Sequence, residues 1–347
     1  MNRIIKHFLL IIFIASNLFS ANSIYYYTWP ISPFNSQHQI NATFGECRSK
    51  TVDGILISRH HIHTGIDIAG PEGTEVRPTI TGKVSIKNAT VGYVQVKKTI
   101  DNITYYFEYH HLKNIPSSVV EGSTVYEGVT PLGYINSLRH LHYVDGGSGF
   151  TVRNPLKYMH PYLDEREPVF SMDRFLITLD MNASTADDYL ATNYFNIQAG
   201  EKIDIIVHAW DEIQTYDEKK GLYWFYLEVK NSLNEPVFGK SQYFQYWADG
   251  FRPNVKLVYA PGSNTSNYLY NLTNEWNYSL NDYWDTSDMA EGQYTVWVDA
   301  YDIGYAEYSS GQIYIFGHEI SDFAYIYVSG SAAESSVNNK KGVTNEN

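Results

Sequence analysis

Three short stretches carry the residues best suited to chemistry, and they are His63-Thr-Gly-Ile-Asp67, Tyr109-His-His-Leu112 and His140-Leu-His142. Neutral imidazole and carboxylate groups are zinc ligands, and a catalytic zinc takes three of them while a fourth position stays open for water. A lone histidine is more often a surface or core residue than a ligand. The joint pattern nevertheless favours a single zinc ion per chain, provided that the three stretches converge.

The spacing within each stretch limits how its residues can be used. In a strand, residues two apart point to the same face about 6.6 Å from each other, so His140 and His142 would face one cleft. His63 and Asp67 would lie about 13 Å apart on a straight strand, which is too far to share one ion. We therefore expect a loop that bends at Gly65 before a strand begins.

The elements around these stretches are predicted to be short strands. Between Ala42 and Tyr162, runs rich in Val, Ile and Tyr are separated by glycine or proline turns about every ten residues, as is typical of a sheet or barrel. One predicted strand begins at Thr104 and ends near His111. His110 has the opposite parity to His111 and is expected to point away, toward the other face of the strand.

These residues resemble the lysostaphin-type (LytM-like) zinc endopeptidases of bacterial cell walls. The resemblance covers about residues 27 to 160 and includes several further motifs: Trp29-Pro30, Phe44-Gly45-Glu46, Ile68-Ala69, Pro71-Glu-Gly-Thr74, Gly82-Lys-Val84, Leu132-Gly133 and Asn154-Pro-Leu156. It implies a β-sheet peptidase domain of the duplicated hybrid motif type, a half-open sandwich with a groove. It also implies that His63, Asp67 and His142 bind zinc and that His111 and His140 are the catalytic pair.

One segment departs from the family's pattern. Relatives have a Gly/Ser/Thr-rich stretch before the H-x-H motif, where it forms one wall of the substrate groove. Here only the six residues 134–139 separate Gly133 from His140. The departure concerns substrate preference and leaves the predicted metal site intact. Asp145, three residues after His142, is either a carboxylate that supports a ligand imidazole or a turn residue.

Length and composition predict an all-β protein of two domains. The chain has 347 residues, of which 44% are hydrophobic and 16% aromatic, with 31 tyrosines, and this composition favours strands. We expect a peptidase domain over 23–163 and an immunoglobulin-like β-sandwich over 164–329, followed by a disordered tail over 330–347. Seven strands are predicted in the second domain, at 175–179, 203–207, 223–229, 243–247, 255–259, 294–298 and 313–316.

Two segments of the second domain resemble each other. They are Ile206-Val-His-Ala-Trp-Asp211 and Trp297-Val-Asp-Ala-Tyr-Asp302, and each reads as a strand that ends at an aspartate. The similarity is short, and it predicts that both segments form the same local structure, a strand followed by a turn.

The first 22 residues predict export. Arg3 and Lys6 precede an apolar run from Phe8, and small residues follow at Ser20 and Ala21, as in a secretory signal peptide. We expect the mature protein in the periplasm, in the cell envelope or secreted from a bacterium, with membrane contact only if the signal stays uncleaved. Cys47 is the sole cysteine, so an intramolecular disulfide is excluded.

Charge is divided unevenly along the chain. Residues 1–163 contain 14 Lys and Arg against 10 Asp and Glu, which gives +4, whereas residues 164–347 contain 11 against 28, which gives −17 and completes the total of −13. A first half of this charge suits a polyanionic wall polymer. The acidic second half excludes nucleic acid as a partner.

The predicted function is zinc-dependent hydrolysis of amide bonds in peptidoglycan peptides. Zinc would lower the pKa of its water to about 7, and one histidine of the pair would take the proton while the other assists the leaving amine. The alternative is a non-catalytic relative that binds wall peptides or activates an amidase. Such relatives lose ligands, and all five side chains are present here.

Overall fold

The structure is a computed structural model that describes residues 27–48, 50–52, 55–58, 61–100, 102–148, 151–179, 190–191, 194–213, 218–244, 246–248, 255–278, 280–309 and 312–330. This part of the chain is almost entirely β-sheet, so the all-β prediction is confirmed. The predicted signal peptide and residues 331–347 lie outside it. Among the described residues, no helix is both long and apolar enough to span a membrane.

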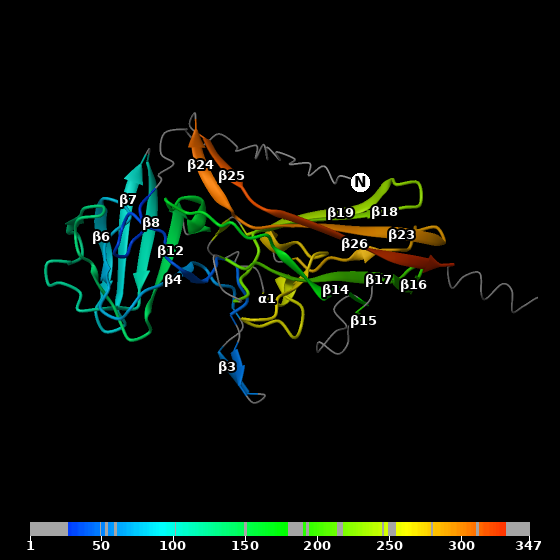
Figure 1. Cartoon of the computed structure of the whole chain (residues 1–347), viewed down its shortest axis with the longest axis horizontal. Coiled ribbons are helices and arrows are strands. Elements are labelled where there is room, and N and C mark those ends of the chain that lie inside the picture. The colour runs from blue at the N-terminus through cyan, green and yellow to red at the C-terminus, as the bar shows by residue number, and fades with distance from the viewer. Residues whose placement is uncertain are drawn as a thin grey trace, which may run out of the picture.

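The largest sheet belongs to the amino-terminal half (Figure 1). Its main path runs β1 (Ile40–Ala42), β4 (Ile66–Ala69), β12 (His140–Ser148), β8 (Ile103–His110), β7 (Tyr93–Ile100), β6 (Gly82–Asn88) and β10 (Thr124–Val125). All of these pairs are antiparallel. The long central strands therefore carry His140, His142 and His110 side by side.

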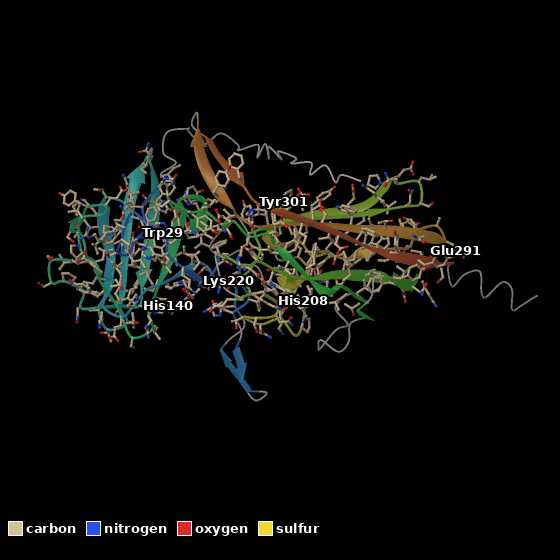
Figure 2. The ribbon with its side chains drawn as sticks, viewed as in Figure 1. Trp29, His140, His208, Lys220, Glu291 and Tyr301 are labelled. Carbon is tan, nitrogen blue, oxygen red and sulfur yellow. The ribbon has the colours of Figure 1, made fainter. Side chains whose placement is uncertain are left out.

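Smaller elements complete this half. A three-stranded sheet contains β5 (Glu75–Val76), β11 (Gly133–Ile135) and β9 (Leu112–Lys113), and a separate hairpin contains β2 (Lys50–Val52) and β3 (Ile55–Ser58). The segment before β1, the aromatic lead-in of residues 27–31, packs into the core, where Tyr27 and Trp29 are only 2% and 1% exposed. Figure 2 labels Trp29 in this half. The Trp29 indole N–H donates to the carbonyl oxygen of Pro161 at 2.6 Å, which joins the two ends of this half.

Two further sheets form most of the carboxy-terminal half. One contains β15 (Leu190–Ala191), β14 (Val169–Leu179), β17 (Lys202–Trp210) and β21 (Leu269–Asn271), with β22 (Trp284–Asp285) also paired to β17. The other contains β16 (Tyr194–Gln198), β26 (Glu319–Ser329), β23 (Gly292–Tyr301), β18 (Trp224–Lys230) and β19 (Pro236–Tyr243). β24 (Tyr305–Ser309) and β25 (Gln312–Phe316) form a hairpin. The immunoglobulin-like topology stays a prediction.

Two of the seven predicted strands in this half are wrong in part or in whole. Val255–Val258 forms the short helix α1 instead of a strand. Val255, Val258 and Tyr259 are all buried, and their spacing of three and four residues matches one helical face. The predicted strand 243–247 is interrupted, because β19 ends at Tyr243 and β20 (Tyr246–Ala248) belongs to the sheet of the other half.

The two halves share one continuous hydrophobic core. β20 pairs with β13 (Thr151–Arg153), which itself pairs with β12, so a strand of the second half extends the sheet that carries the histidines. Lys220 lies between the halves in Figure 2, and its Nζ donates to the carbonyl oxygen of Asn41 at 2.8 Å. The domain boundary between residues 163 and 164 stays a prediction, but hydrophobic side chains from both sides of it pack into the same core.

The two similar segments of the sequence end at one group of buried carboxylates. Asp211 follows β17 and Asp302 follows β23, and together with Asp164 they bring carboxylate oxygens within 4.8 Å of one another. All three are at most 2% exposed. Burial and the neighbouring carboxylates Asp302 and Asp164 raise the pKa of Asp211 well above its ordinary 3.8. Burial also raises the pKa of Asp302, although its contact with His318 opposes this.

Replacing Asp211 by Asn should therefore stabilise the protein at high pH. A carboxyl group whose pKa is raised by folding stabilises the native state below about pH 4, and this contribution is lost as the pH rises through the raised pKa. Asp211→Asn is neutral throughout, so its free energy of unfolding should exceed that of the wild type at pH 8, by on the order of 1 kcal/mol, and approach it near pH 4. Urea unfolding at both pH values measures this. An equal difference at the two values would contradict the assignment.

Candidate metal centre

The pairing of β4 with β12 brings two of the predicted ligands together. The register places His142 opposite Asp67 and His140 opposite Ala69. Residues directly opposite in an antiparallel pair have Cβ atoms about 4.5–5.5 Å apart. The Nδ1 atom of His142 consequently lies 2.9 Å from Oδ1 of Asp67. Two ligands are thus positioned by strand register alone.

The third ligand arrives through the predicted bend. β4 begins at Ile66, so His63 lies in the preceding turn, and its Nε2 is 3.2 Å from Oδ1 of Asp67. Gly65 makes the turn possible, because a Cβ at this position would meet the carbonyl oxygen of Tyr143 at 2.3 Å. The chain can approach β12 this closely only without a side chain.

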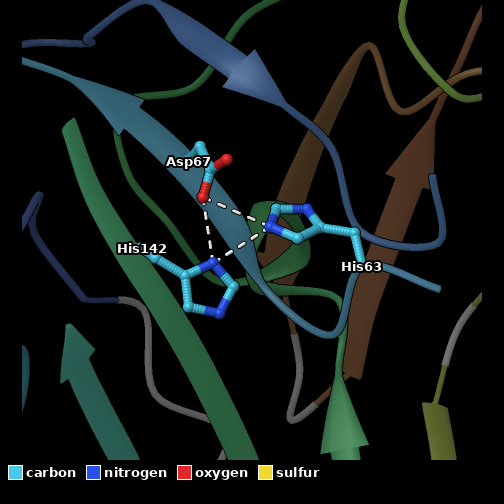
Figure 3. A group of neighbouring side chains, drawn as sticks. All are labelled: His63, Asp67 and His142. Atoms are coloured by element: carbon cyan, nitrogen blue, oxygen red, sulfur yellow. Dashed lines mark hydrogen bonds and ion pairs between the residues drawn. The ribbon is translucent and has the colours of Figure 1, made fainter. Parts of the chain in front are cut away.

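The three donor atoms fit a tetrahedral zinc ion. Nε2 of His63 and Nδ1 of His142 are 2.9 Å apart, and each lies 2.9–3.2 Å from Oδ1 of Asp67 (Figure 3). Zinc bonds of about 2.0–2.1 Å place tetrahedral donors roughly 3.4 Å apart, which is within a few tenths of an ångström of these separations. Two ring nitrogens and a carboxylate oxygen that face one point form a suitable donor set for a divalent cation.

Backbone and side-chain contacts orient these ligands from outside. Nδ1 of His63 lies 2.8 Å from the carbonyl oxygen of Thr43, so Nδ1 carries the proton and Nε2 presents its lone pair to the centre. A guanidinium nitrogen of Arg48 donates to Oδ2 of Asp67 at 3.3 Å, which leaves Oδ1 for the metal. No sequence pattern marks Thr43 or Arg48 for these roles, because such contacts depend on tertiary structure.

The electrostatics of the ligands favour their metal-binding forms. Burial by itself raises the pKa of Asp67, but the nearby imidazoles of His63 and His142 outweigh burial, so this pKa lies below its ordinary 3.8. Burial lowers the pKa of His142 to about 4, although its bond to Asp67 opposes that shift. At neutral pH the aspartate is therefore ionised and the imidazole of His142 is neutral, as metal ligation requires.

The two predicted catalytic histidines lie together beside the donors. The ring centroids of His111 and His140 are 4.7 Å apart, and that of His111 is 6.1 Å from that of His142. Nε2 of His140 lies 3.9 Å from Oδ1 of Asp67. Both residues are partly exposed, whereas His63 and Asp67 are each only 4% exposed. The accessible side of the centre is thus the side occupied by His111 and His140.

The short segment before His140 holds both of these histidines. The amide N–H of Asn136 donates to the carbonyl oxygen of His111 at 2.9 Å. Nδ1 of His140 lies 2.9 Å from the carbonyl oxygen of Leu138, so this nitrogen carries the proton and Nε2 is free to accept one. Burial, followed by the charge of His140, lowers the pKa of His111 to about 4, so His111 is neutral at pH 7.

The prediction that His110 points away from the site is wrong. The register pairs His110 with His142, and their ring centroids are 5.2 Å apart. Nε2 of His110 also contacts Glu108 at 3.0 Å. The strand register puts His110 on the same face as His142, and β8 ends there. Simple alternation fails at the next residue, because His111 adopts a left-handed φ of 63° and so lies on this side as well.

Asp145 takes neither of its predicted roles. It lies within β12, is 0% exposed, and accepts bonds of 2.7–3.0 Å from the guanidinium group of Arg153 and a further bond from the hydroxyl group of Tyr27. This buried ion pair stabilises the aromatic lead-in against the sheet, away from the ligand imidazoles.

Known proteins provide only partial similarities. No family model and no curated protein matches the chain. A zinc-containing peptidase from Vibrio cholerae is 25% identical, with a TM-score of 0.26, over 32% of this chain and 33% of its own. Csd3 of Helicobacter pylori is 21% identical, with a TM-score of 0.29, over 39% of this chain and 35% of its own. The present chain therefore spans about a third of each solved structure.

Replacing Gly65 by Ala should weaken zinc binding by about tenfold or more, because the new methyl group would displace the turn that carries His63. Gly82→Ala is a matched control. A Cβ at Gly82 would meet the carbonyl oxygen of Lys97 at 2.5 Å. Gly82 belongs to β6, which is in the same sheet but is separated from β12 by β8 and β7. Both variants should lose stability, by on the order of 1–3 kcal/mol. Competition with a chromophoric chelator measures affinity, and equal zinc affinities in the two variants would argue against the role of Gly65.

Proposed function

We propose that this chain is a zinc-dependent endopeptidase that hydrolyses amide bonds in peptidoglycan peptides. The convergence of His63, Asp67 and His142 on one point, with His111 and His140 on its exposed side, supports the proposal most directly. A purely structural site would be closed by a fourth protein ligand. Here the imidazoles of His111 and His140 stand beside the three donors instead.

The chain's own residues suit the proton transfers of amide hydrolysis. Zinc held by the three donors supplies Lewis acidity, which polarises a carbonyl group and makes water more acidic. His140 has a fixed tautomer with Nε2 available to accept a proton from the attacking water. His111 is neutral at pH 7, and its ring centroid lies 4.7 Å from that of His140. It can therefore orient that water or support the developing oxyanion. The histidine that receives the proton then delivers it to the leaving amine.

The substrate class rests on the resemblance of residues 27–160 to cell-wall endopeptidases and on charge. Without Arg3 and Lys6 of the predicted signal peptide, residues 23–163 contain 12 Lys and Arg against 10 Asp and Glu, and this net charge of +2 is compatible with an anionic polymer. The predicted signal peptide would deliver the protein to the bacterial envelope, where peptidoglycan is found. We expect no nucleic-acid partner.

Incubating the mature protein with zinc and purified sacculi should release new amino groups, which can be labelled and identified by mass spectrometry. His142→Ala should lose both zinc and activity. His140→Ala should retain stoichiometric zinc but lose activity by about 10²–10⁴-fold, as expected for a general acid or base. His160→Ala, which alters an exposed histidine outside the group, should match the wild type.

The outcomes separate the two functions under consideration. Amine release by zinc-free His142→Ala would refute zinc-dependent hydrolysis. A wild-type protein that binds zinc and sacculi yet releases no more amine than a chelated control would instead be a non-catalytic wall-binding protein.

A further inference from the structure

A buried carboxylate that the proposed chemistry does not use lies between the metal centre and the carboxy-terminal half. Glu46 is 1% exposed, which is unusual for a glutamate unless its oxygens are fully paired. It sits in the loop after β1, in neither of the two strands that carry Asp67 and His142. Its contacts reach toward two of the three ligands.

The first set of contacts leads to His63. Oε1 of Glu46 accepts from the amide N–H of Thr43 at 2.7 Å and from the Thr43 hydroxyl group at 2.9 Å. The carbonyl oxygen of Thr43 is the acceptor that fixes the tautomer of His63. The amide N–H of His63 also donates to the backbone carbonyl oxygen of Glu46 at 2.9 Å. The position of the His63 ring therefore depends on the geometry of this loop.

The second set of contacts leads to Asp67. Oε2 of Glu46 lies 3.7 Å from one guanidinium nitrogen of Arg48, and another nitrogen of the same group is 3.3 Å from Oδ2 of Asp67. One guanidinium thus connects the buried glutamate with the ligand aspartate. Because its planar fork has a fixed shape, a change in the position of one carboxylate alters the contact with the other.

The third set of contacts comes from the carboxy-terminal half. The amide N–H of Gly221 donates to Oε1 of Glu46 at 3.2 Å. The hydroxyl group of Tyr259 donates to the carbonyl oxygen of Gly45 at 2.8 Å. Phe244 covers Gly45 so closely that a Cβ there would meet its ring at 2.5 Å. Residues more than 170 positions away in the sequence hold the loop that orients His63.

We propose that Glu46 is a positioning residue for the metal centre, and that through it the segment around Gly221 makes the carboxy-terminal half part of the support of the zinc ligands. The inference rests on the proposed zinc site. It assigns the second half a task distinct from wall binding: holding two ligands in the geometry that zinc requires.

Two substitutions approach Glu46 from opposite sides. Glu46→Gln keeps the shape of the side chain but replaces the oxygen that faces Arg48 by an amide nitrogen, which places two donors against each other. Gly221→Ala leaves every residue of the amino-terminal half unchanged, but its Cβ would meet Cγ of Glu46 at 2.9 Å. Each should raise the zinc dissociation constant of the full-length protein by about 10- to 100-fold, the range observed when groups behind metal ligands are altered.

Two matched controls separate positioning from general loss of stability. Asp204→Asn alters a carboxylate that is equally buried but bonds to Thr273 within the carboxy-terminal half. Gly239→Ala adds a methyl group in β19, where the nearest atom is the carbonyl oxygen of Leu227 at 3.3 Å. Both should retain wild-type zinc affinity, even where thermal unfolding shows lower stability.

Zinc dissociation constants are measured by chelator competition at a temperature where circular dichroism shows each variant folded. Unchanged affinity in Glu46→Gln and Gly221→Ala would overturn the inference, while the zinc site itself would stand. A wild-type protein that does not bind zinc would overturn the proposed function instead. If Glu46→Gln does not fold, Gly221→Ala decides the question alone, since a change in its affinity relative to Gly239→Ala supports the inference and equality refutes it.

Discussion

The candidate metal centre depends on three donor atoms being held within about 3 Å of one another. Imidazole nitrogens and a carboxylate oxygen this close together and largely buried need a cation or shared protons to offset their mutual repulsion. Strand register supplies two of the donors, and the bend at Gly65 supplies the third. The rest of the amino-terminal half maintains both the register and the bend, because the sheet fixes the register and the loop after β1 fixes the His63 ring.

Much of this could be predicted from local sequence. The all-β architecture follows from composition and turn spacing, and the bend at Gly65 follows from the distance that four extended residues would impose. Features that depend on one unusual backbone angle or on distant contacts could not be predicted. His110 faces the centre because the register pairs it with His142, and His111 lies on the same side because it adopts a left-handed conformation. Thr43, Glu46 and Arg48 support the ligands through contacts that no spacing rule reveals.

In the carboxy-terminal half, too, local sequence predicts only part of the structure. β18 and β23 alternate because one face of each is buried, whereas β17 is buried on both faces. Val255–Val258 is typical of a strand by residue type, yet it forms a single helical turn in which Val255, Leu257 and Val258 are buried. The similarity between the segments ending at Asp211 and Asp302 is short in sequence. In space the two aspartates meet beside Asp164, and this concentrates like charges in the interior of an already acidic half.

The turn over 136–139 has a consequence for how this protein can diversify. One short segment holds the backbone of His111 and the ring of His140 at the same time. Here an insertion would displace both histidines together. Under the proposed function, only changes outside this turn could alter substrate preference and still leave both histidines in place.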